Sequence, residues 1–167
     1  RDVLTPGAVI ARLEAVEQNR RLLLTALRLD PARLVTAGQV HGAAVTRARA
    51  AGLYPACDAL VTTEPGLTLA VSGADCLPVL LTGPHVVAAV HAGWRGAAAG
   101  APTAALQALG ECSEADPRRV QAHFGPCIRD CCYRVGVDVA RRFPDSALRW
   151  DQDSVYLSLP AAVRLAL

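Results

Sequence analysis

The sequence predicts an α+β fold, a mixed sheet with flanking helices, in one domain spanning residues 1–167. Several short apolar runs between residues 59 and 90 are separated by turn residues, as in strands joined by hairpins. Longer stretches with helical spacing precede and follow them. Strands and helices do not alternate in a strict βαβ order, and no internal repeat or linker divides the chain.

The first half of the chain is predicted to begin with a helix over about residues 8–28, which Asp30 and Pro31 end. An extended run from Leu34 to Val40 follows, and residues 47–57 are predicted to form a loop. The expected strands of the sheet are Ala59–Thr62, Leu67–Val71, Pro78–Leu81 and Val86–Val90, with Pro65–Gly66 and Gly83–Pro84 as breaks.

The second half is predicted to contain an Ala-rich helix over Gly96–Leu109, with Pro102 marking a kink or a late helix start. A strand over Val120–Phe124 and a helix over Val137–Phe143 follow. Ser158 is the expected N-cap of a last helix that begins near Leu159 and Pro160. That helix has no stop signal, which predicts a chain that lacks a terminal segment.

The charged residues restrict the chemistry available to the protein. All 17 basic residues are Arg and none is Lys, which excludes a Schiff-base lysine, a lysine general base and a P-loop lysine. An anion site must therefore use Arg or backbone amides. The net charge of +2 is too small to indicate a nucleic-acid or membrane partner.

Six cysteines raise the question of disulfides, but Arg1 and Asp2 are not followed by the apolar segment of a secretory signal. The longest apolar runs have the length of strands and are too short to span a bilayer. We therefore expect reduced thiols in a cytoplasmic protein, and a monomer.

Three residues that can bind a soft or borderline metal ion each follow or adjoin an apolar run, beside glycine. They are His41, Cys76 and His91. Strand ends in one sheet lie side by side, so these residues can converge despite their separation in sequence. One thiolate and two imidazoles suit Zn²⁺, with copper as the second choice. Three protein ligands leave a fourth position for water, as in catalytic sites.

The segment from His91 to Gly96 indicates an anion site beside the metal. Gly93 and Gly96 lie between a strand and a helix start, where free amides favour an anion, and Arg95 adds a bidentate fork. Trp94 offers a flat face for a heterocyclic base, although a core position explains it equally well. Asp75 is a candidate to orient a ligand histidine or to carry a proton, and a turn or capping role explains it equally well.

A second cluster of metal-binding residue types occurs later in the chain, at His123, Cys127, Cys131 and Cys132. Gly125–Pro126 interrupts any helix that would align them. Adjacent cysteines are also poorly placed to bind one ion together. Packing is therefore the favoured interpretation of this cluster.

Five segments occur in an order that closely resembles the YfiH family, also called the laccase-domain or multicopper polyphenol oxidase family. They are Gln-Val-His-Gly (39–42), Asp-Ala-Leu-Val-Thr (58–62), Ala-Asp-Cys-Leu-Pro-Val-Leu (74–80), His-Ala-Gly-Trp-Arg-Gly (91–96) and Gly-Pro-Cys-Ile…Cys-Cys-Tyr-x-Val-Gly (125–136). Asn19-Arg20 fits the same pattern. The resemblance runs from about residue 15 to the end of the chain.

The resemblance implies an α+β fold related to cysteine hydrolases, with zinc bound by His41, Cys76 and His91 and with Asp75 and Arg95 in the pocket. It implies phosphorolysis of adenosine, inosine, guanosine and 5′-methylthioadenosine, together with adenosine deamination. The implied partners are purine nucleosides and phosphate. The chain departs from the family in lacking an N-terminal Arg-Gly-Gly segment and a C-terminal Phe-Phe-Ser-Tyr-Arg-Arg stretch, and in having Arg134 where Glu is usual.

The same residues are compatible with other functions. Cys76 could be a covalent nucleophile with His91 or His41 as its base, as in a metal-free cysteine hydrolase. The chain could also bind purines or a metal ion without catalysis. The polyphenol-oxidase label fits the composition poorly, because a multicopper array needs many histidines and this chain has four.

Overall fold

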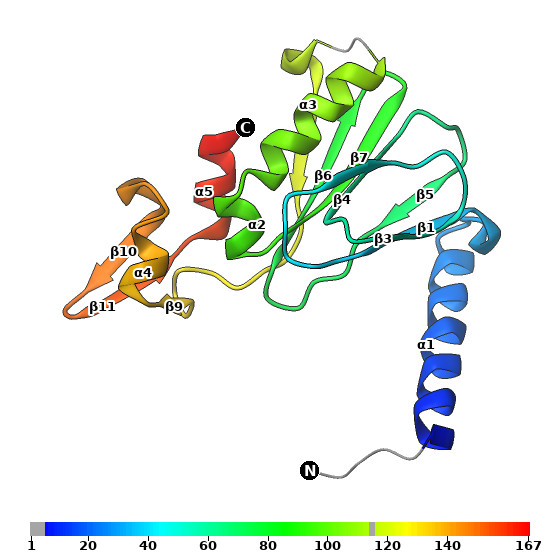
Figure 1. The fold of residues 1–167 in the computed structure, drawn as a ribbon, viewed down its shortest axis with the longest axis horizontal. Coiled ribbons are helices and arrows are strands. Elements are labelled where there is room, and N and C mark those ends of the chain that lie inside the picture. The colour runs from blue at the N-terminus through cyan, green and yellow to red at the C-terminus, as the bar shows by residue number, and fades with distance from the viewer. Residues whose placement is uncertain (1–5, 114–115) are drawn as a thin grey trace.

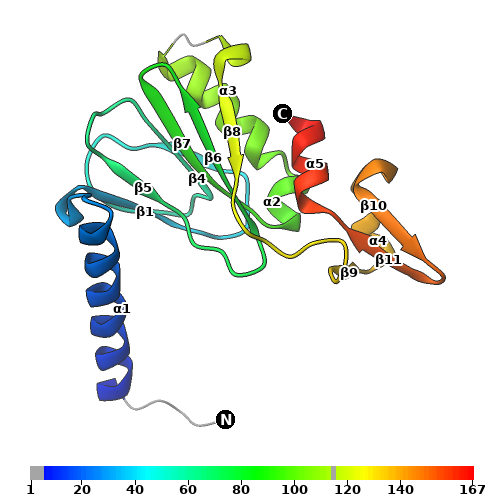
Figure 2. The same cartoon turned by 180° about the vertical axis from the view of Figure 1, so that it is seen from behind.

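The computed structural model of the chain describes residues 6–113 and 116–167, so Arg1 and Asp2 lie outside it. The helices are α1 (Pro6–Ala26), α2 (Trp94–Ala98), α3 (Ala101–Ser113), α4 (Val137–Ala140) and α5 (Leu159–Ala166). The strands are β1 (Leu34–Gly38), β2 (Val45–Arg47), β3 (Gly52–Pro55), β4 (Ala59–Thr62), β5 (Thr68–Ala70), β6 (Leu77–Gly83), β7 (Val86–Ala92), β8 (Gln121–Phe124), β9 (Arg134–Val135), β10 (Leu148–Asp151) and β11 (Ser154–Leu157). Figures 1 and 2 show their arrangement.

The central sheet has five strands in the order β2-β4-β7-β6-β8. β2 pairs with β4 in parallel, and the other neighbours are antiparallel. β6 and β7 form a hairpin in which Pro78 lies opposite His91. The mixed sheet with flanking helices is therefore confirmed.

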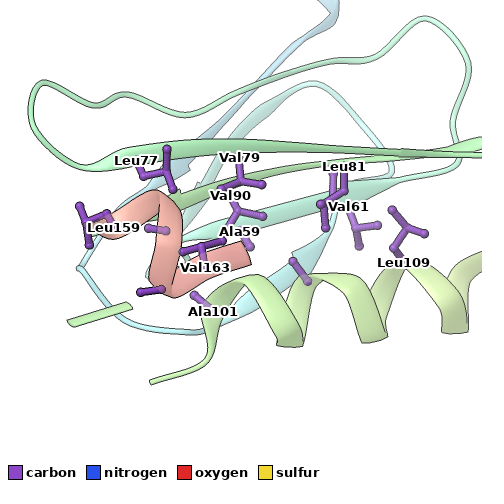
Figure 3. Close-up of a cluster of buried hydrophobic side chains, with 14 of the residues drawn as sticks. Ala59, Val61, Leu77, Val79, Leu81, Val90, Ala101, Leu109, Leu159 and Val163 are labelled. Atoms are coloured by element: carbon purple, nitrogen blue, oxygen red, sulfur yellow. The ribbon is translucent and has the colours of Figure 1, made fainter. Parts of the chain in front are cut away.

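Both faces of β4 are covered, which explains why all four of its residues are buried. Successive side chains of a strand point to opposite faces. Ala59 and Val61 pack with residues of α3 and α5, as Figure 3 shows, whereas Leu60 packs with Val35 of β1 on the other face. The interior is filled mainly by Ala, Val and Leu, as expected from a chain with 4% aromatic residues.

Two smaller sheets complete the fold. β3-β1-β5 is entirely parallel, and β10-β11-β9 is antiparallel. In both ribbon views, β1 and β5 lie on the side of the molecule from which α1 projects, and the hairpin of β10 and β11 lies with α4 at the opposite end. Among the described residues, no helix is both long enough and apolar enough to cross a membrane.

The predicted strand Ala59–Thr62 is confirmed as β4, and those predicted within residues 78–81, 86–90 and 120–124 are confirmed as β6, β7 and β8 with end shifts of one or two residues. The strand predicted over Leu67–Val71 exists as β5, but it belongs to the sheet β3-β1-β5 and not to the central sheet as expected. Ser158 caps α5 by accepting a hydrogen bond from the amide of Ala161. The helix predicted over Gly96–Leu109 is instead two helices, α2 and α3. Gly100 separates them with a φ of +81°, a left-handed conformation that glycine adopts readily. Pro102 lies in the first turn of α3, so the late helix start is the correct alternative.

Other sequence-based expectations were wrong. The loop predicted over residues 47–57 contains β3, an exposed edge strand. Its Gly52 and Pro55 are residue types that are uncommon in strands, which is why the sequence indicated a loop. The helix predicted over Val137–Phe143 ends at Ala140. Hairpins do not join all the strands, because β1 pairs in parallel with both β3 and β5. The sheet β10-β11-β9 was not predicted at all.

Helix α1 forms close to where it was predicted, but most of its described apolar side chains are exposed. Leu13, Val16 and Leu23 are exposed, as is Leu27 just after the helix, and Leu24 is the buried residue among the described side chains of α1. Helical periodicity therefore identified the secondary structure correctly without identifying a covered face.

Truncating Leu109 tests the core between α3 and the central sheet. Its side chain is fully buried, so Leu109→Ala should lower the free energy of unfolding by about 2–5 kcal/mol. Leu23→Ala removes the same atoms from an exposed helical position and should change stability by less than about 0.5 kcal/mol. Urea denaturation measures both, and equal effects would contradict this packing.

Candidate metal centre

Two loops and the end of strand β7 bring the predicted ligands together. His41 follows β1, Cys76 immediately precedes β6, and His91 lies near the end of β7. One ligand atom from each of these residues lies within 4.8 Å of the others, and the two imidazole rings meet edge to face with centroids 4.8 Å apart. A thiolate and two imidazoles at this spacing can hold a metal ion, with Zn²⁺ the best match to the donor set.

Asp58, which immediately precedes β4, connects the parts of this centre through hydrogen bonds. Its buried carboxylate accepts hydrogen bonds from the amides of Val40, His41 and Gly42, at 3.2, 2.9 and 2.7 Å. It also lies 2.8 Å from Nδ1 of His91, which leaves Nε2 free to face a ligand position. Burial alone would raise the pKa of Asp58, but the hydrogen bonds from His91 and the three amides outweigh it and lower the pKa.

The loop that carries His41 is also held by hydrogen bonds between Gln39 and Ser72. The side-chain amide of Gln39 donates to the carbonyl of Ser72 and accepts from its N–H, each at 2.7 Å, which joins this loop to the loop of Cys76. His41 itself has a φ of +62°, a left-handed conformation that is unfavourable for a residue with a side chain. Such strain costs on the order of 1–3 kcal/mol and persists only where the surroundings impose it.

Two glycines allow the loops to approach closely. A Cβ atom at Gly93 would lie 2.8 Å from Sγ of Cys76 and 3.3 Å from His41, so a larger residue would intrude on the centre. A Cβ atom at Gly96 would lie 2.8 Å from the carbonyl oxygen of Gly42. Both glycines were singled out as amides for an anion, and the structure adds that both are buried where the backbone is tightly packed.

Arg95 and Trp94, the other residues of the predicted anion segment, lie on the short helix α2. Arg95 is exposed, with its guanidinium carbon 4.5 Å from the centroid of the Trp94 ring. Trp94 is half-buried and packs against the main core, so the packing interpretation accounts for part of its surface. No described contact links either side chain to the three candidate ligands.

Asp75 does not have the orienting role considered for it. Its side chain is exposed and forms no hydrogen bond within the described residues, and Asp58 contacts His91 instead. Sequence reasoning placed Asp58 in a family motif but gave it no function. The available signal was one carboxylate within a run of apolar residues, because a buried charge requires partners.

The segment from Gly125 to Tyr133 packs near Cys76. The amide of Ile128 donates to the carbonyl of Asp75 at 3.0 Å. Burial raises the pKa of the Cys76 thiol, and the negative charges of Asp75 and Asp58 raise it further. A free Cys76 would thus be less ionised than an ordinary thiol, whereas a bound cation favours the thiolate.

The alternative cluster of metal-binding residues is not assembled. Among the described side chains, the group of His41, Cys76 and His91 is the one in which three or more potential ligands converge. Sγ of Cys131 lies 3.2 Å from Sγ of Cys132, but His123 and Cys127 do not join them in such a group. This agrees with the packing interpretation of the cluster.

Replacing Asp58 tests its function as an orienting group. Asp58→Asn should weaken Zn²⁺ binding about 10- to 100-fold, because an amide is a poorer acceptor for the His91 ring and the three amides. Asp75→Asn, a matched change at an exposed carboxylate, should leave the affinity within about twofold, since it has no described contact with a ligand. Competition with a chromophoric chelator measures both affinities. The reverse ranking would overturn this assignment.

Asp58 also predicts a dependence of stability on pH. Its pKa in the folded chain lies below the ordinary value of 3.8, so the ionised group stabilises the fold above that value. This contribution is lost as the pH falls toward the folded pKa. In the presence of a chelator, wild type should lose more unfolding free energy than Asp58→Asn between about pH 5 and pH 3. Parallel curves from urea titrations would contradict the prediction.

Comparisons with known proteins agree with the resemblance noted in the sequence. A family model described as "Multi-copper polyphenol oxidoreductase laccase" matches residues 8–167. The chain is 47% identical over 134 residues to a purine nucleoside phosphorylase of Streptomyces coelicolor, a match that covers 77% of this chain and 55% of that protein. It is 37% identical over 131 residues to the purine nucleoside phosphorylase YfiH of Escherichia coli, covering 77% of this chain and 52% of that protein.

A solved structure shares the fold. The crystal structure of the Bacillus licheniformis protein YfiH superposes with a TM-score of 0.87 at 28% identity, covering 92% of this chain and 65% of that one. The chain thus spans roughly half to two thirds of the length of these proteins. Because the family model spans nearly the whole chain, and the relatives include proteins named YfiH, this chain belongs to the YfiH family of laccase-domain proteins.

Proposed function

We propose that the chain is a zinc-dependent purine nucleoside phosphorylase that uses the centre of His41, Cys76 and His91. The observation that carries this proposal is the convergence of their three ligand atoms within 4.8 Å, on a buried carboxylate that contacts His91. Relatives that share this family are named purine nucleoside phosphorylases. The substrates we propose are adenosine, inosine, guanosine and 5′-methylthioadenosine, with inorganic phosphate as the second substrate.

In phosphorolysis, an oxygen of phosphate forms a bond to C1′ of the ribose while the bond from C1′ to the purine nitrogen breaks. The products are ribose 1-phosphate and the free base, which takes up a proton. Arg95 would bind the phosphate through its guanidinium fork, because Arg is the cation that this lysine-free chain offers. Asp75, exposed beside Cys76, would move the proton. His41, Cys76 and His91 would hold a zinc ion, which would supply positive charge to the reacting atoms.

The proposal extends to adenosine deamination in the same pocket. There, a water oxygen adds at C6 of the purine and ammonia leaves, so that adenosine and water become inosine and ammonia. His41, Cys76 and His91 would fix the position of the metal ion, and Asp75 would again transfer the proton. One centre would thus serve two reactions on the same nucleoside.

Two alternatives have distinct outcomes in experiments. A metal-free hydrolase would rely on a Cys76 thiolate, which the raised pKa of this thiol disfavours. It would show alkylation of Cys76 and no stoichiometric zinc. A non-catalytic binding protein would hold nucleosides tightly without converting them. The histidines of this chain are not arranged for the several copper ions of a multicopper polyphenol oxidase. His85 and His123 are exposed and lie outside the converging group of His41, Cys76 and His91.

Substituting Cys76 tests the shared centre. Cys76→Ala should reduce phosphorolysis and deamination by at least about 100-fold, because it removes one of the three ligands. Cys112→Ala, on helix α3 and outside the centre, should retain near wild-type rates. The measurement is chromatography of inosine, adenine and ribose 1-phosphate after incubation with adenosine and phosphate, with and without a chelator. Full phosphorolysis by Cys76→Ala would refute a single shared site.

A further inference from the structure

A small pocket between α2 and the end of α4 collects positive charge without any acidic residue. Trp94, Arg95, Ala98 and Ala99 line it from α2, and Arg142 lines it from the turn after α4. Its volume is about 310 Å³, at the small end of the range for ligand pockets. Neither the metal-binding residues nor the family motifs include Arg142.

The two arginines of this pocket share one aromatic ring. The guanidinium carbon of Arg95 lies 4.5 Å from the centroid of Trp94, and that of Arg142 lies 5.9 Å from it. Within residues 6–113 and 116–167, neither side chain forms a hydrogen bond or an ion pair. Other arginines do: Arg33 donates to two backbone carbonyls, and Arg20 and Arg21 both pair with Glu17.

This arrangement places two permanent positive charges in the lining of one small pocket. A guanidinium stays protonated at every physiological pH, so the repulsion between Arg95 and Arg142 is not relieved by loss of a proton. Both guanidinium groups lie near the Trp94 indole ring and line the same pocket, and no carboxylate in the lining neutralises them. A bound dianion would neutralise both charges and would satisfy two forks of N–H donors.

The pocket adjoins the candidate metal centre along the chain. Trp94 directly follows Gly93, the residue at which an added Cβ atom would meet Sγ of Cys76 and the ring of His41. An anion held over Trp94 therefore lies on the helix that begins at the centre. Arg142 approaches from a different part of the sequence, so it can add to the anion site without being part of the motif that contains Arg95.

We propose that this pocket is the phosphate subsite of the enzyme and that Arg142 is its second arginine, acting with Arg95. This inference rests on the proposed function, since the bound phosphate is the second substrate of phosphorolysis. Two arginine forks favour a tetrahedral phosphate dianion over a carboxylate with a single charge. Trp94 positions both forks through its ring.

The neighbouring Arg141 provides a matched control. It is exposed, carries the same charge and does not line the pocket. The test is calorimetric titration of the 167-residue chain with inorganic phosphate, without nucleoside and at constant ionic strength. Arg142→Gln should weaken phosphate binding at least about tenfold, and Arg142→Lys should weaken it less. Arg141→Gln should remain within about twofold of wild type.

Several results would overturn the subsite. These are undetectable phosphate binding to wild type, equal weakening by Arg142→Gln and Arg141→Gln, or unchanged binding in Arg142→Gln. Tighter binding of adenosine 5′-monophosphate than of phosphate, lost in Arg142→Gln, would also overturn it, because the pocket would then accept a nucleotide. Melting temperature and zinc stoichiometry confirm that each variant is folded.

The assay of turnover separates this inference from the proposed function. If both hold, Arg142→Gln raises the KM for phosphate more than the KM for nucleoside. If wild type phosphorolyses adenosine and the KM for phosphate is the same in Arg142→Gln, the function stands and the subsite fails. If wild type binds phosphate through Arg142 but never consumes it with a nucleoside, the anion pocket stands, while the proposed function and the assignment of phosphate as a substrate both fail.

Discussion

The carboxylate of Asp58 is the interaction on which the candidate site depends. It immediately precedes β4, a strand buried on both faces, and it joins three successive amides of the His41 loop to the imidazole of His91 in β7. A buried carboxylate without partners would be strongly unfavourable, so each of these hydrogen bonds stabilises the charge as well as the loop. Fold stability and ligand geometry therefore rely on the same group.

The remaining parts of the centre follow from this anchor. Gln39 and Ser72 tie the two exposed loops to each other, and Gly93 leaves the space that the thiol of Cys76 occupies. These contacts come from segments that are distant in sequence and adjacent at one end of the sheet. The centre is thus assembled by tertiary structure rather than by any local motif.

Sequence reasoning succeeded where a pattern is local or a residue type is rare. The strands β4, β6, β7 and β8 of the central sheet were predicted from apolar runs, whereas β2 was not predicted. The three converging candidate ligands were selected because each lies at an apolar run beside glycine. It failed where the outcome depends on distant contacts. The residues of Gly52–Pro55 do not indicate an edge strand beside β1. The apolar neighbours of Asp58 indicate a buried charge but do not identify His91 as its partner. Arg142 likewise becomes relevant only when the fold brings it over Trp94.

At His41, the left-handed backbone conformation favours glycine, whereas metal binding needs a side chain. Glycine would adopt this conformation without strain, and the amide that bonds to Asp58 would remain. Selection for folding stability alone would therefore favour glycine at this position, whereas a ligand requires the imidazole. The strained histidine marks a point where the chain retains chemical capacity at the expense of conformational ease.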